Sequence, residues 1–205
     1  MLAIVDYGLG NVRSVRNALT HIGVESVLTR DADELTMADG LILPGVGAFG
    51  EGSRRLNAYN LQPVLRSAVS AGKPTLGICL GYQLLMRSSN ELGAHDGLGF
   101  LPMDVIRLPV TVRLPHIGWS EVHTPDESLG APRLIDGLEG ERFYFVHSYG
   151  VVEPANQLTY CTAVYGDCAL VALVERENVF GTQFHPEKSG EAGLQLLRNF
   201  SSLTK

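Results

Sequence analysis

The sequence has no long hydrophobic run and no excess of basic residues. No apolar stretch approaches the about 18 residues that a membrane-spanning helix requires. The short apolar segment 2–5 ends at Asp6 and has no basic leader, so we expect a buried strand there and not a signal peptide. Sixteen basic and 22 acidic side chains give a formal charge of −6, which disfavours binding to a nucleic-acid backbone. We therefore expect neither a membrane nor a nucleic acid as a partner.

Cysteine is scarce as well. The three cysteines, Cys79, Cys161 and Cys168, are too few and odd in number to form a disulfide framework in a chain of 205 residues. This favours a reducing compartment, the cytoplasm. Cys161 and Cys168 have no cysteine or histidine at metal-ligand spacing, so we expect no metal site. The Gly-Leu-Gly segment 8–10 is followed by Arg13 where a dinucleotide fingerprint needs a third glycine, and the sequence indicates no bound cofactor.

The first half of the chain alternates short apolar runs with segments of helical periodicity. Hydrophobic residues make up 45% of the chain and charged residues 19%, which is typical of a globular domain. The pattern predicts strands at 2–7, 24–29, 40–43 and 75–79, and helices at 12–22, 61–69 and 80–87. Repeated strand–helix–strand units of this length indicate a parallel sheet with helices on both faces.

The pattern changes after about residue 97. Four apolar runs at 143–152, 158–165, 169–176 and 179–184 are separated by short turns, which predicts antiparallel strands. A final amphipathic helix carries Leu194, Leu197 and Phe200 on one side. No repeat or linker divides the sequence. We therefore expect residues 1–205 to form one α/β domain with an open, mixed, mostly parallel sheet flanked by helices.

The strongest local motif is Gly77-Ile78-Cys79-Leu80-Gly81, which lies between a predicted strand and a predicted helix. A glycine on each side of a nucleophile is typical of a nucleophile elbow, a sharp turn that leaves no room for Cβ atoms at the two glycines. The start of the following helix offers N–H groups and a positive dipole, which favour a thiolate over a thiol. The alternative is a cysteine buried in the core at the end of a strand.

A thiol nucleophile needs a base, and the base needs a group that orients it. His185-Pro186-Glu187 supplies both, just after the predicted strand 179–184. Glu187 can accept a hydrogen bond from one imidazole nitrogen and leave the other to face Cys79. The alternative is a loop histidine beside a surface glutamate. Together the two motifs predict a catalytic triad of Cys79, His185 and Glu187.

The segment Pro44-Gly45-Val46-Gly47 ends a neighbouring predicted strand. Its glycines let the backbone turn an N–H group towards a carbonyl oxygen as the carbonyl carbon becomes tetrahedral. One donor near Val46 and one at Leu80, the residue after the nucleophile, would form an oxyanion hole. Taken alone, a glycine-rich segment after a strand is only a turn.

Along the chain the three motifs occur in the order Pro44-Gly45-Val46-Gly47, Gly77-Ile78-Cys79-Leu80-Gly81 and His185-Pro186-Glu187. In this order they resemble the class I, or triad-type, glutamine amidotransferases. Further segments resemble one branch of that family, the glutaminase subunits of imidazole glycerol phosphate synthases in histidine biosynthesis. They are Asp6-Tyr7-Gly8-Leu9-Gly10-Asn11, His116-Ile117-Gly118-Trp119, Tyr144-Phe145-Val146-His147-Ser148-Tyr149 and His185-Pro186-Glu187-Lys188-Ser189, with the terminal helix ending near Asn199-Phe200. The resemblance covers nearly the whole chain. Ser120 and Gly190 depart from it, because the family usually has asparagine and glutamine there.

The resemblance implies that Cys79 attacks the side-chain amide of L-glutamine, forms a γ-glutamyl thioester and releases ammonia, after which water frees glutamate. His185 is then expected to act as general base and acid, and Glu187 to orient it. The positions expected to hold the substrate are Gly45, Gly47, Gln83, Ser148 and Tyr149.

The resemblance also implies a partner, a (β/α)8-barrel cyclase subunit in a heterodimer. Ammonia would pass, shielded from water, to this cyclase, which would split a ribulosyl-phosphate nucleotide intermediate into imidazole glycerol phosphate and an aminoimidazole carboxamide ribotide. The positions expected to face the partner are Asn11, Trp119, Tyr144 and Lys188. From the residues alone, the two aromatic side chains could instead be core residues and the lysine a solvated surface charge.

Three other functions remain open at this stage. The same fold and elbow could serve a different synthase, form a catalytically idle regulatory module, or act as a stand-alone cysteine hydrolase. The complete triad argues against an idle module. The sequence has no evident peptide-binding insertion, which argues against a stand-alone hydrolase.

Overall fold

A computed structural model describes residues 1–125, 130–156 and 158–204. Its centre is a seven-stranded sheet with the strand order β11-β12-β13-β4-β3-β1-β2. The strands are β1 (Leu2–Val5), β2 (Ser26–Thr29), β3 (Gly40–Gly45), β4 (Thr75–Cys79), β11 (Thr159–Tyr165), β12 (Cys168–Arg176) and β13 (Val179–Thr182). The strands from β13 to β2 run parallel, and β12 and β11 extend the sheet in antiparallel pairing. The prediction of a mixed, mostly parallel sheet is confirmed.

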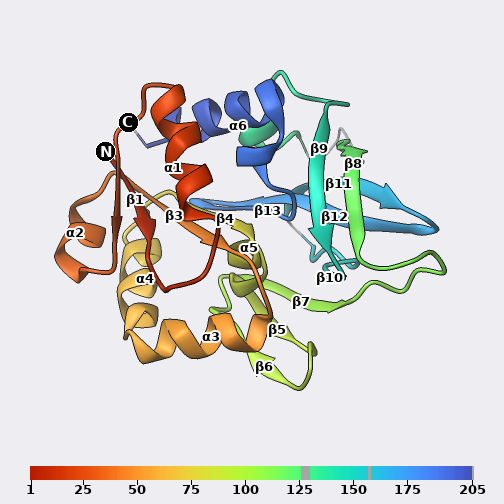
Figure 1. Ribbon diagram of the computed structural model, residues 1–205, viewed down its shortest axis with the longest axis horizontal. Coiled ribbons are helices and arrows are strands. Elements are labelled where there is room, and N and C mark those ends of the chain that lie inside the picture. Colours follow the sequence, from red (N-terminus) through yellow and green to blue (C-terminus); the bar gives the residue numbers. More distant parts are fainter. Residues whose placement is uncertain (126–129, 157, 205) are drawn as a thin grey trace.

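Helices cover both faces of this sheet (Figure 1). On one face lie α1 (Val12–His21) and α6 (Gly190–Ser202), and on the other lie α2 (Ala32–Met37), α3 (Phe49–Ala58), α4 (Leu61–Ser70) and α5 (Leu80–Leu84). Within the three described ranges, no helix has the length and apolarity that crossing a bilayer requires.

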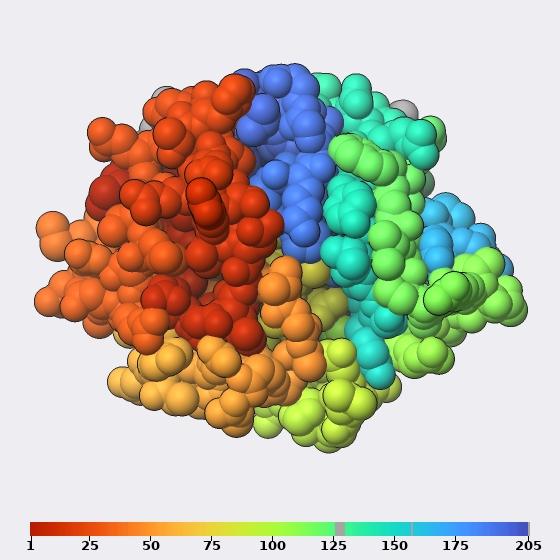
Figure 2. Space-filling model, in the orientation of Figure 1, coloured from red at the N-terminus to blue at the C-terminus, as the bar shows by residue number. Residues whose placement is uncertain are grey.

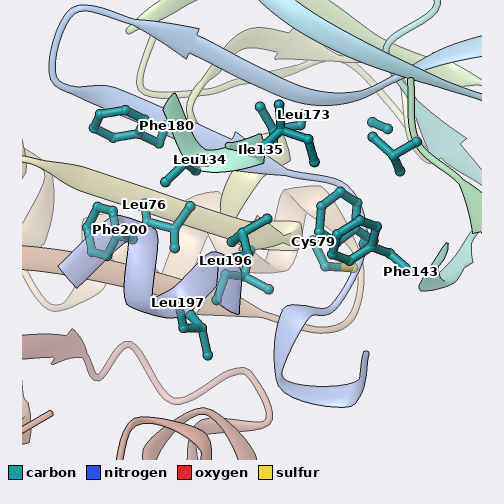
Figure 3. Packing of buried hydrophobic residues seen from close by; sticks show 14 of the residues in the cluster. Leu76, Cys79, Leu134, Ile135, Phe143, Leu173, Phe180, Leu196, Leu197 and Phe200 are labelled. Atoms are coloured by element: carbon teal, nitrogen blue, oxygen red, sulfur yellow. The ribbon is translucent and has the colours of Figure 1, made fainter. Parts of the chain in front are cut away.

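Each face of the sheet contributes to its own hydrophobic core. Successive residues of a strand point to opposite faces, so Leu2 and Ile4 of β1 pack beneath α1 and α6, whereas Ala3 and Val5 pack beneath the other helices. All of them are buried, as is typical of a parallel sheet covered on both sides. Figure 3 shows part of the first core, in which Leu76, Phe180, Leu196, Leu197 and Phe200 come together.

Two smaller sheets complete the fold. One has the order β10-β7-β5-β6 and consists of β5 (Met86–Ser89), β6 (His95–Asp96), β7 (Leu101–Arg107) and β10 (Tyr149–Gly150). The other is an antiparallel ribbon of β8 (His116–Glu121) and β9 (Arg142–His147), at the right of Figure 1. Two 3-10 turns, η2 (Arg133–Ile135) and η3 (Pro186–Lys188), contact α6.

Three predicted elements are corrected by the structure. The helix predicted at 80–87 ends at Leu84, and residues 86–89 form β5. The apolar run 84–86 is buried, and a run this short does not distinguish helix from strand. The single strand predicted at 143–152 breaks at Ser148, and its two parts join different sheets. The last strand pairs antiparallel with β12 but parallel with β4.

The sequence patterns also failed to predict α2 and α3. α2 begins after Asp31, whose carboxylate accepts hydrogen bonds from the backbone N–H groups of Asp33 and Glu34, both at 3.0 Å. Such a capping aspartate is a signal that the sequence does contain. α3 buries Phe49 and Leu56, which stand two helical turns apart.

Candidate active site

The predicted catalytic residues follow three neighbouring strands of the central sheet. β4 ends at Cys79 and lies between β3, which ends at Gly45, and β13, which leads to His185. The carboxyl ends of adjacent parallel strands meet at one edge of a sheet. The spatial order of the strands therefore brings together residues that are far apart in the sequence.

The two glycines around Cys79 occupy positions that admit no side chain. A Cβ atom on Gly81 would lie 1.7 Å from the carbonyl oxygen of Leu43, and one on Gly77 would lie 2.7 Å from the Cα and N atoms of Tyr82. In both cases the obstacle is backbone, which cannot move aside as a flexible side chain can. The pentapeptide therefore forms a tight strand-to-helix turn of the kind that the motif predicted.

Cys79 has a backbone conformation that residues other than glycine rarely adopt, with φ of 54° and ψ of −108°. Such a conformation costs about 1–3 kcal/mol and is typical of functional sites. The thiol is buried at the edge of the core that also contains Phe143 (Figure 3). The Nε2 group of Gln183 lies 3.9 Å from its sulfur. Sequence analysis did not single out Gln183, although it stands two residues before His185.

His185 and Glu187 form a buried pair. The Nδ1 atom of His185 lies 2.8 Å from Oε1 of Glu187, and each side chain is only 1% exposed. Nε2 of the imidazole and Oε2 of the carboxylate have no hydrogen-bond partner among the described residues. Burial lowers the pKa of His185, but the charge interaction with the nearby Cys79 sulfur and the hydrogen bond to Glu187 outweigh burial and raise the pKa to about 9. Nε2 is therefore available for proton transfer.

The backbone of His185 is fixed by β9 and by Ser189. The N–H group of His185 donates to the carbonyl oxygen of Tyr144 at 2.9 Å, and the N–H group of Tyr144 donates to Ser189 Oγ at 3.0 Å. The Ser189 hydroxyl donates in turn to the carbonyl oxygen of His185 at 2.6 Å. This ring of hydrogen bonds ties the turn η3 to the ribbon strand.

A cavity of about 400 Å³ opens at the thiol. The face shown in Figure 2 is hollowed between the orange segment that follows β3 and the cyan strand β9, with the olive segment around α5 at the floor. The predicted residues that line the cavity are Val46, Gly47, Cys79, Leu80, Gln83, Ser148, Tyr149 and His185. Gly45 lies opposite Cys79 in the strand register, and Glu187 reaches the site through its bond to His185.

Gln83 and Glu91 contribute polar groups to the cavity wall in different ways. Nε2 of Gln83 donates to the carbonyl oxygen of Tyr149 at 2.9 Å and to Oε1 of Gln183 at 3.0 Å, so it braces the wall. Glu91, which sequence analysis missed, lines the cavity and accepts a hydrogen bond from the backbone N–H of Phe49 at 2.7 Å. No local motif marks Glu91, because only the tertiary fold brings it to the cavity.

Two buried histidines form a directed hydrogen-bond chain next to the cavity. The carbonyl oxygen of Tyr149 can only accept, so His147 Nδ1, 2.8 Å away, carries a hydrogen. His147 Nε2 then accepts from His116 Nδ1 at 3.2 Å, and His116 Nε2 accepts from the Ser120 hydroxyl at 3.0 Å. Burial lowers the pKa of His116 to about 4 and that of His147 to about 3, so both imidazoles stay neutral at neutral pH. Ser120, a departure from the family pattern, ends this chain as a donor.

Both predicted oxyanion donors line the cavity. Leu80 is the first residue of α5, where backbone N–H groups have no acceptor within the helix. Val46 is 39% exposed, and Gly47 after it has a φ of +114°, which favours glycine. The placement is compatible with an oxyanion hole, and the assignment stays a prediction.

Three of the residues predicted to face a partner cluster at the ribbon, where Trp119 and Lys188 are exposed and Tyr144 is half-buried. Trp119 and Tyr144 pair across it with ring centroids 6.0 Å apart, and Nζ of Lys188 lies 5.8 Å from the centroid of the Tyr144 ring. Trp119 is 47% exposed and Ile117 is 59% exposed. Trp119 is therefore not a core residue. The fourth predicted residue, Asn11, precedes α1, which contacts the turn that carries Lys188.

The other two cysteines offer no second site of this kind. Cys161 and Cys168 are buried thiols, and burial raises the pKa of both, to about 12 for Cys161. A thiol with a raised pKa is a poor nucleophile at neutral pH. Across the described ranges, no group of three or more histidine, cysteine, aspartate or glutamate side chains is arranged to hold a metal ion.

Comparisons with known proteins agree with this geometry. The family model for glutamine amidotransferase class-I matches residues 3–202. The imidazole glycerol phosphate synthase subunit HisH of Methanothermobacter thermautotrophicus is 45% identical over 205 residues, which cover 100% of both chains. The HisH subunit of Aquifex aeolicus is 47% identical over 199 residues, which cover 96% of this chain and 94% of that one. A crystal structure of a glutamine amidotransferase, at 23% identity, matches the fold with a TM-score of 0.78 over 98% of each chain.

The strand order, the elbow and the full-length matches lead to one assignment. The fold is shared with solved glutamine amidotransferases, and the sequence relatives narrow the assignment further because their identity extends from one end of the chain to the other. The chain therefore belongs to the class I glutamine amidotransferase family, and within that family to the HisH subunits of imidazole glycerol phosphate synthase.

Proposed function

We propose that the chain hydrolyses L-glutamine to glutamate and ammonia with Cys79 as the nucleophile. The observation that carries the proposal is the buried pair of His185 and Glu187 beside the thiol. Native proteins seldom leave buried polar atoms without partners, and both His185 Nε2 and Glu187 Oε2 lack one among the described residues. This supports a role in proton transfer over a purely structural one.

The reaction begins with attack of the Cys79 thiolate on the side-chain amide carbon. A C–S bond forms as the carbonyl π pair moves onto oxygen, and the backbone N–H groups of Val46 and Leu80 stabilise that oxyanion. When the tetrahedral species collapses, the C–N bond breaks and the imidazolium of His185 protonates the leaving nitrogen, which departs as ammonia. Water, deprotonated by His185, then attacks the thioester carbon, and the C–S bond breaks to free glutamate and restore the Cys79 thiolate. Glu187 keeps the imidazole in one tautomer throughout.

The cavity offers groups for the amino-acid end of the substrate. The carboxylate of Glu91 at the cavity wall suits the α-ammonium group, because charge-assisted hydrogen bonds are the strong ones. Ser148 and Tyr149 border the same space, and Gln83 contributes by holding the backbone of Tyr149. Gly45 and Gly47 contribute backbone, because a side chain on Gly45 would collide with its neighbours.

The partner in this proposal is a (β/α)8-barrel cyclase that consumes the ammonia. The relatives are named as subunits of imidazole glycerol phosphate synthase, and a subunit requires a partner. The exposed apolar cluster of Ile117 and Trp119 supports such an interface, because large apolar side chains gathered at a surface are typical of contact sites. Tyr144, Lys188 and Asn11 are proposed to belong to the same contact.

The test measures glutamine hydrolysis by the wild-type chain and by Cys79→Ala. Each is assayed alone and mixed with the cyclase subunit. We expect the mixture of wild-type subunits to be active and Cys79→Ala to lose activity by at least about 10³-fold with an unchanged fold. Cys168→Ala is the matched control and is expected to keep its activity. Labelling of the chain by a glutamine-like electrophile should require Cys79. Glutaminase activity that survives in Cys79→Ala would exclude the proposal.

A further inference from the structure

Tyr7 is a fully buried tyrosine whose hydroxyl group has no hydrogen-bond partner among the described residues. Tyr82, the other tyrosine buried to the same degree in those ranges, donates its hydroxyl to the carbonyl oxygen of Val171 at 3.1 Å. A buried hydroxyl without a partner destabilises the folded state, so its presence calls for an explanation. Burial raises the pKa of Tyr7, so the phenol stays protonated and is able to donate.

The Tyr7 hydroxyl touches the segment that carries a predicted oxyanion donor. Tyr7 follows β1, and β1 lies beside β3 in the sheet. A Cβ atom on Gly45 would lie 2.3 Å from the Tyr7 oxygen and 2.7 Å from Leu80 Cβ. The phenol oxygen therefore lies against the α-carbon of Gly45, one peptide bond from Val46.

Peptide geometry links this contact to the oxyanion hole. In a trans peptide the N–H and C=O groups point in opposite directions. If the N–H group of Val46 points into the cavity, the carbonyl oxygen of Gly45 points away from it, towards the protein interior. A buried carbonyl group there needs a donor. The Tyr7 hydroxyl is the unpartnered donor at that place.

We propose that Tyr7 is a positioning residue whose hydroxyl donates to the carbonyl oxygen of Gly45 when the Val46 N–H group is turned into the cavity to stabilise the oxyanion. The inference rests on the proposed glutaminase function. Because the hydroxyl gains its bond only in that conformation, it favours the catalytic arrangement of segment 44–47 over others. Gly47, which has a φ of +114° here, has no Cβ atom and can therefore adopt the different backbone conformations that such a rotation needs.

The test is Tyr7→Phe, measured in the complex with the cyclase subunit. Loss of one hydrogen bond that forms only with the oxyanion arrangement should lower kcat for glutamine hydrolysis by about 3- to 10-fold and leave KM within about twofold. The melting temperature should stay the same or rise, because the variant removes a buried polar group that had no partner. A fall in kcat without a fall in stability is a combination that a merely structural hydroxyl would not give.

Tyr82→Phe is the matched control, since it removes a buried hydroxyl that does have a partner. We expect its melting temperature to fall by about 2–4 °C and kcat per folded molecule to change by less than about twofold. An unchanged kcat in Tyr7→Phe, or a kcat that falls together with the melting temperature, would overturn the inference. Absence of glutaminase activity in the wild-type complex would overturn the proposed function itself, so the two failures are distinguishable.

Discussion

Glu187 holds the imidazole of His185 through a single contact of 2.8 Å between Oε1 and Nδ1, in surroundings that leave each side chain 1% exposed. Glu187→Gln replaces the carboxylate by an amide of similar shape, which favours the wrong imidazole tautomer. We expect kcat for glutamine hydrolysis to fall by about 10²- to 10⁴-fold with little change in KM. Steady-state assays of the complex with the cyclase subunit measure both constants.

The control for this variant is Glu191→Gln. Glu191 is exposed and pairs with Arg198, with Oε1 2.6 Å from Nη1. Its replacement should leave kcat unchanged within about twofold, since exposed pairs contribute little. A Glu187→Gln enzyme that kept more than about a third of the wild-type kcat would contradict the role given to the carboxylate.

The pKa of His185 should depend on Cys79. Burial alone lowers this pKa, and Cys79 and Glu187 together raise it to about 9. Removal of the sulfur in Cys79→Ala leaves burial in place and takes away part of the opposing effect, so the pKa should fall. NMR titration of the imidazole measures it directly, with Cys168→Ala as the control. An equal pKa in wild type and Cys79→Ala would show that the two side chains do not interact.

The same shift has a consequence for stability. A histidine whose pKa is raised from 6.5 to about 9 on folding contributes stability that is fully present below pH 6.5 and is lost as the pH rises through about 9. The free energy of unfolding of wild type should therefore fall more steeply over this pH range than that of Cys79→Ala. Denaturant titrations at several pH values measure the difference. Parallel curves would contradict the linkage.

Gly81 should tolerate no side chain. In Gly81→Ala the new Cβ atom would meet the Leu43 carbonyl oxygen at 1.7 Å, so we expect a loss of at least about 2–3 kcal/mol in the free energy of unfolding. Gly23→Ala is the comparison, because Gly23 has open space around it but a φ of +74°. Its cost should be about 1–2 kcal/mol, from backbone conformation alone. An equal loss in the free energy of unfolding for both variants would argue against the tight turn at Gly81.

Trp119 should contribute to partner binding but not to folding. Because the side chain is 47% exposed, Trp119→Ala should leave the melting temperature nearly unchanged. We expect it to weaken binding of the cyclase subunit by about 2 kcal/mol, or about 30-fold in Kd. Isothermal titration measures Kd, and Met37→Ala, at a side chain that is 84% exposed on α2, is the control. Equal affinity of Trp119→Ala and wild type would remove Trp119 from the interface.

The sequence predicted those parts of the molecule that depend on local pattern. The elbow around Cys79 is a strand, a turn and a helix within a few residues. Gly77 is required there by a local contact with the backbone of Tyr82, whereas the contact that requires Gly81 is with Leu43 of the neighbouring strand. His185 and Glu187 are two residues apart, so their contact also follows from the local chain. The central sheet was predicted because apolar runs of strand length alternate with helical stripes over the first half of the chain.

The parts that could not be predicted depend on contacts between distant segments. The brace from Gln83 to Gln183 joins residues 100 positions apart, and no pattern in either segment points to the other. The chain from His116 to His147 depends on the register of β8 with β9, in which these two residues are direct partners. Ser148, where the predicted long strand breaks, has no sequence signal that marks the change of sheet.

The main-chain groups and the side chain of Tyr144 make contacts with different parts of the molecule. Tyr144 anchors His185 only through its main-chain N–H and C=O groups, while its aromatic ring lies with Trp119 and Lys188. Any amino acid except proline can supply those two main-chain groups. If Tyr144 contacts the cyclase as proposed, its side chain can change with the partner surface over evolutionary time without disturbing the alignment of the His185 imidazole.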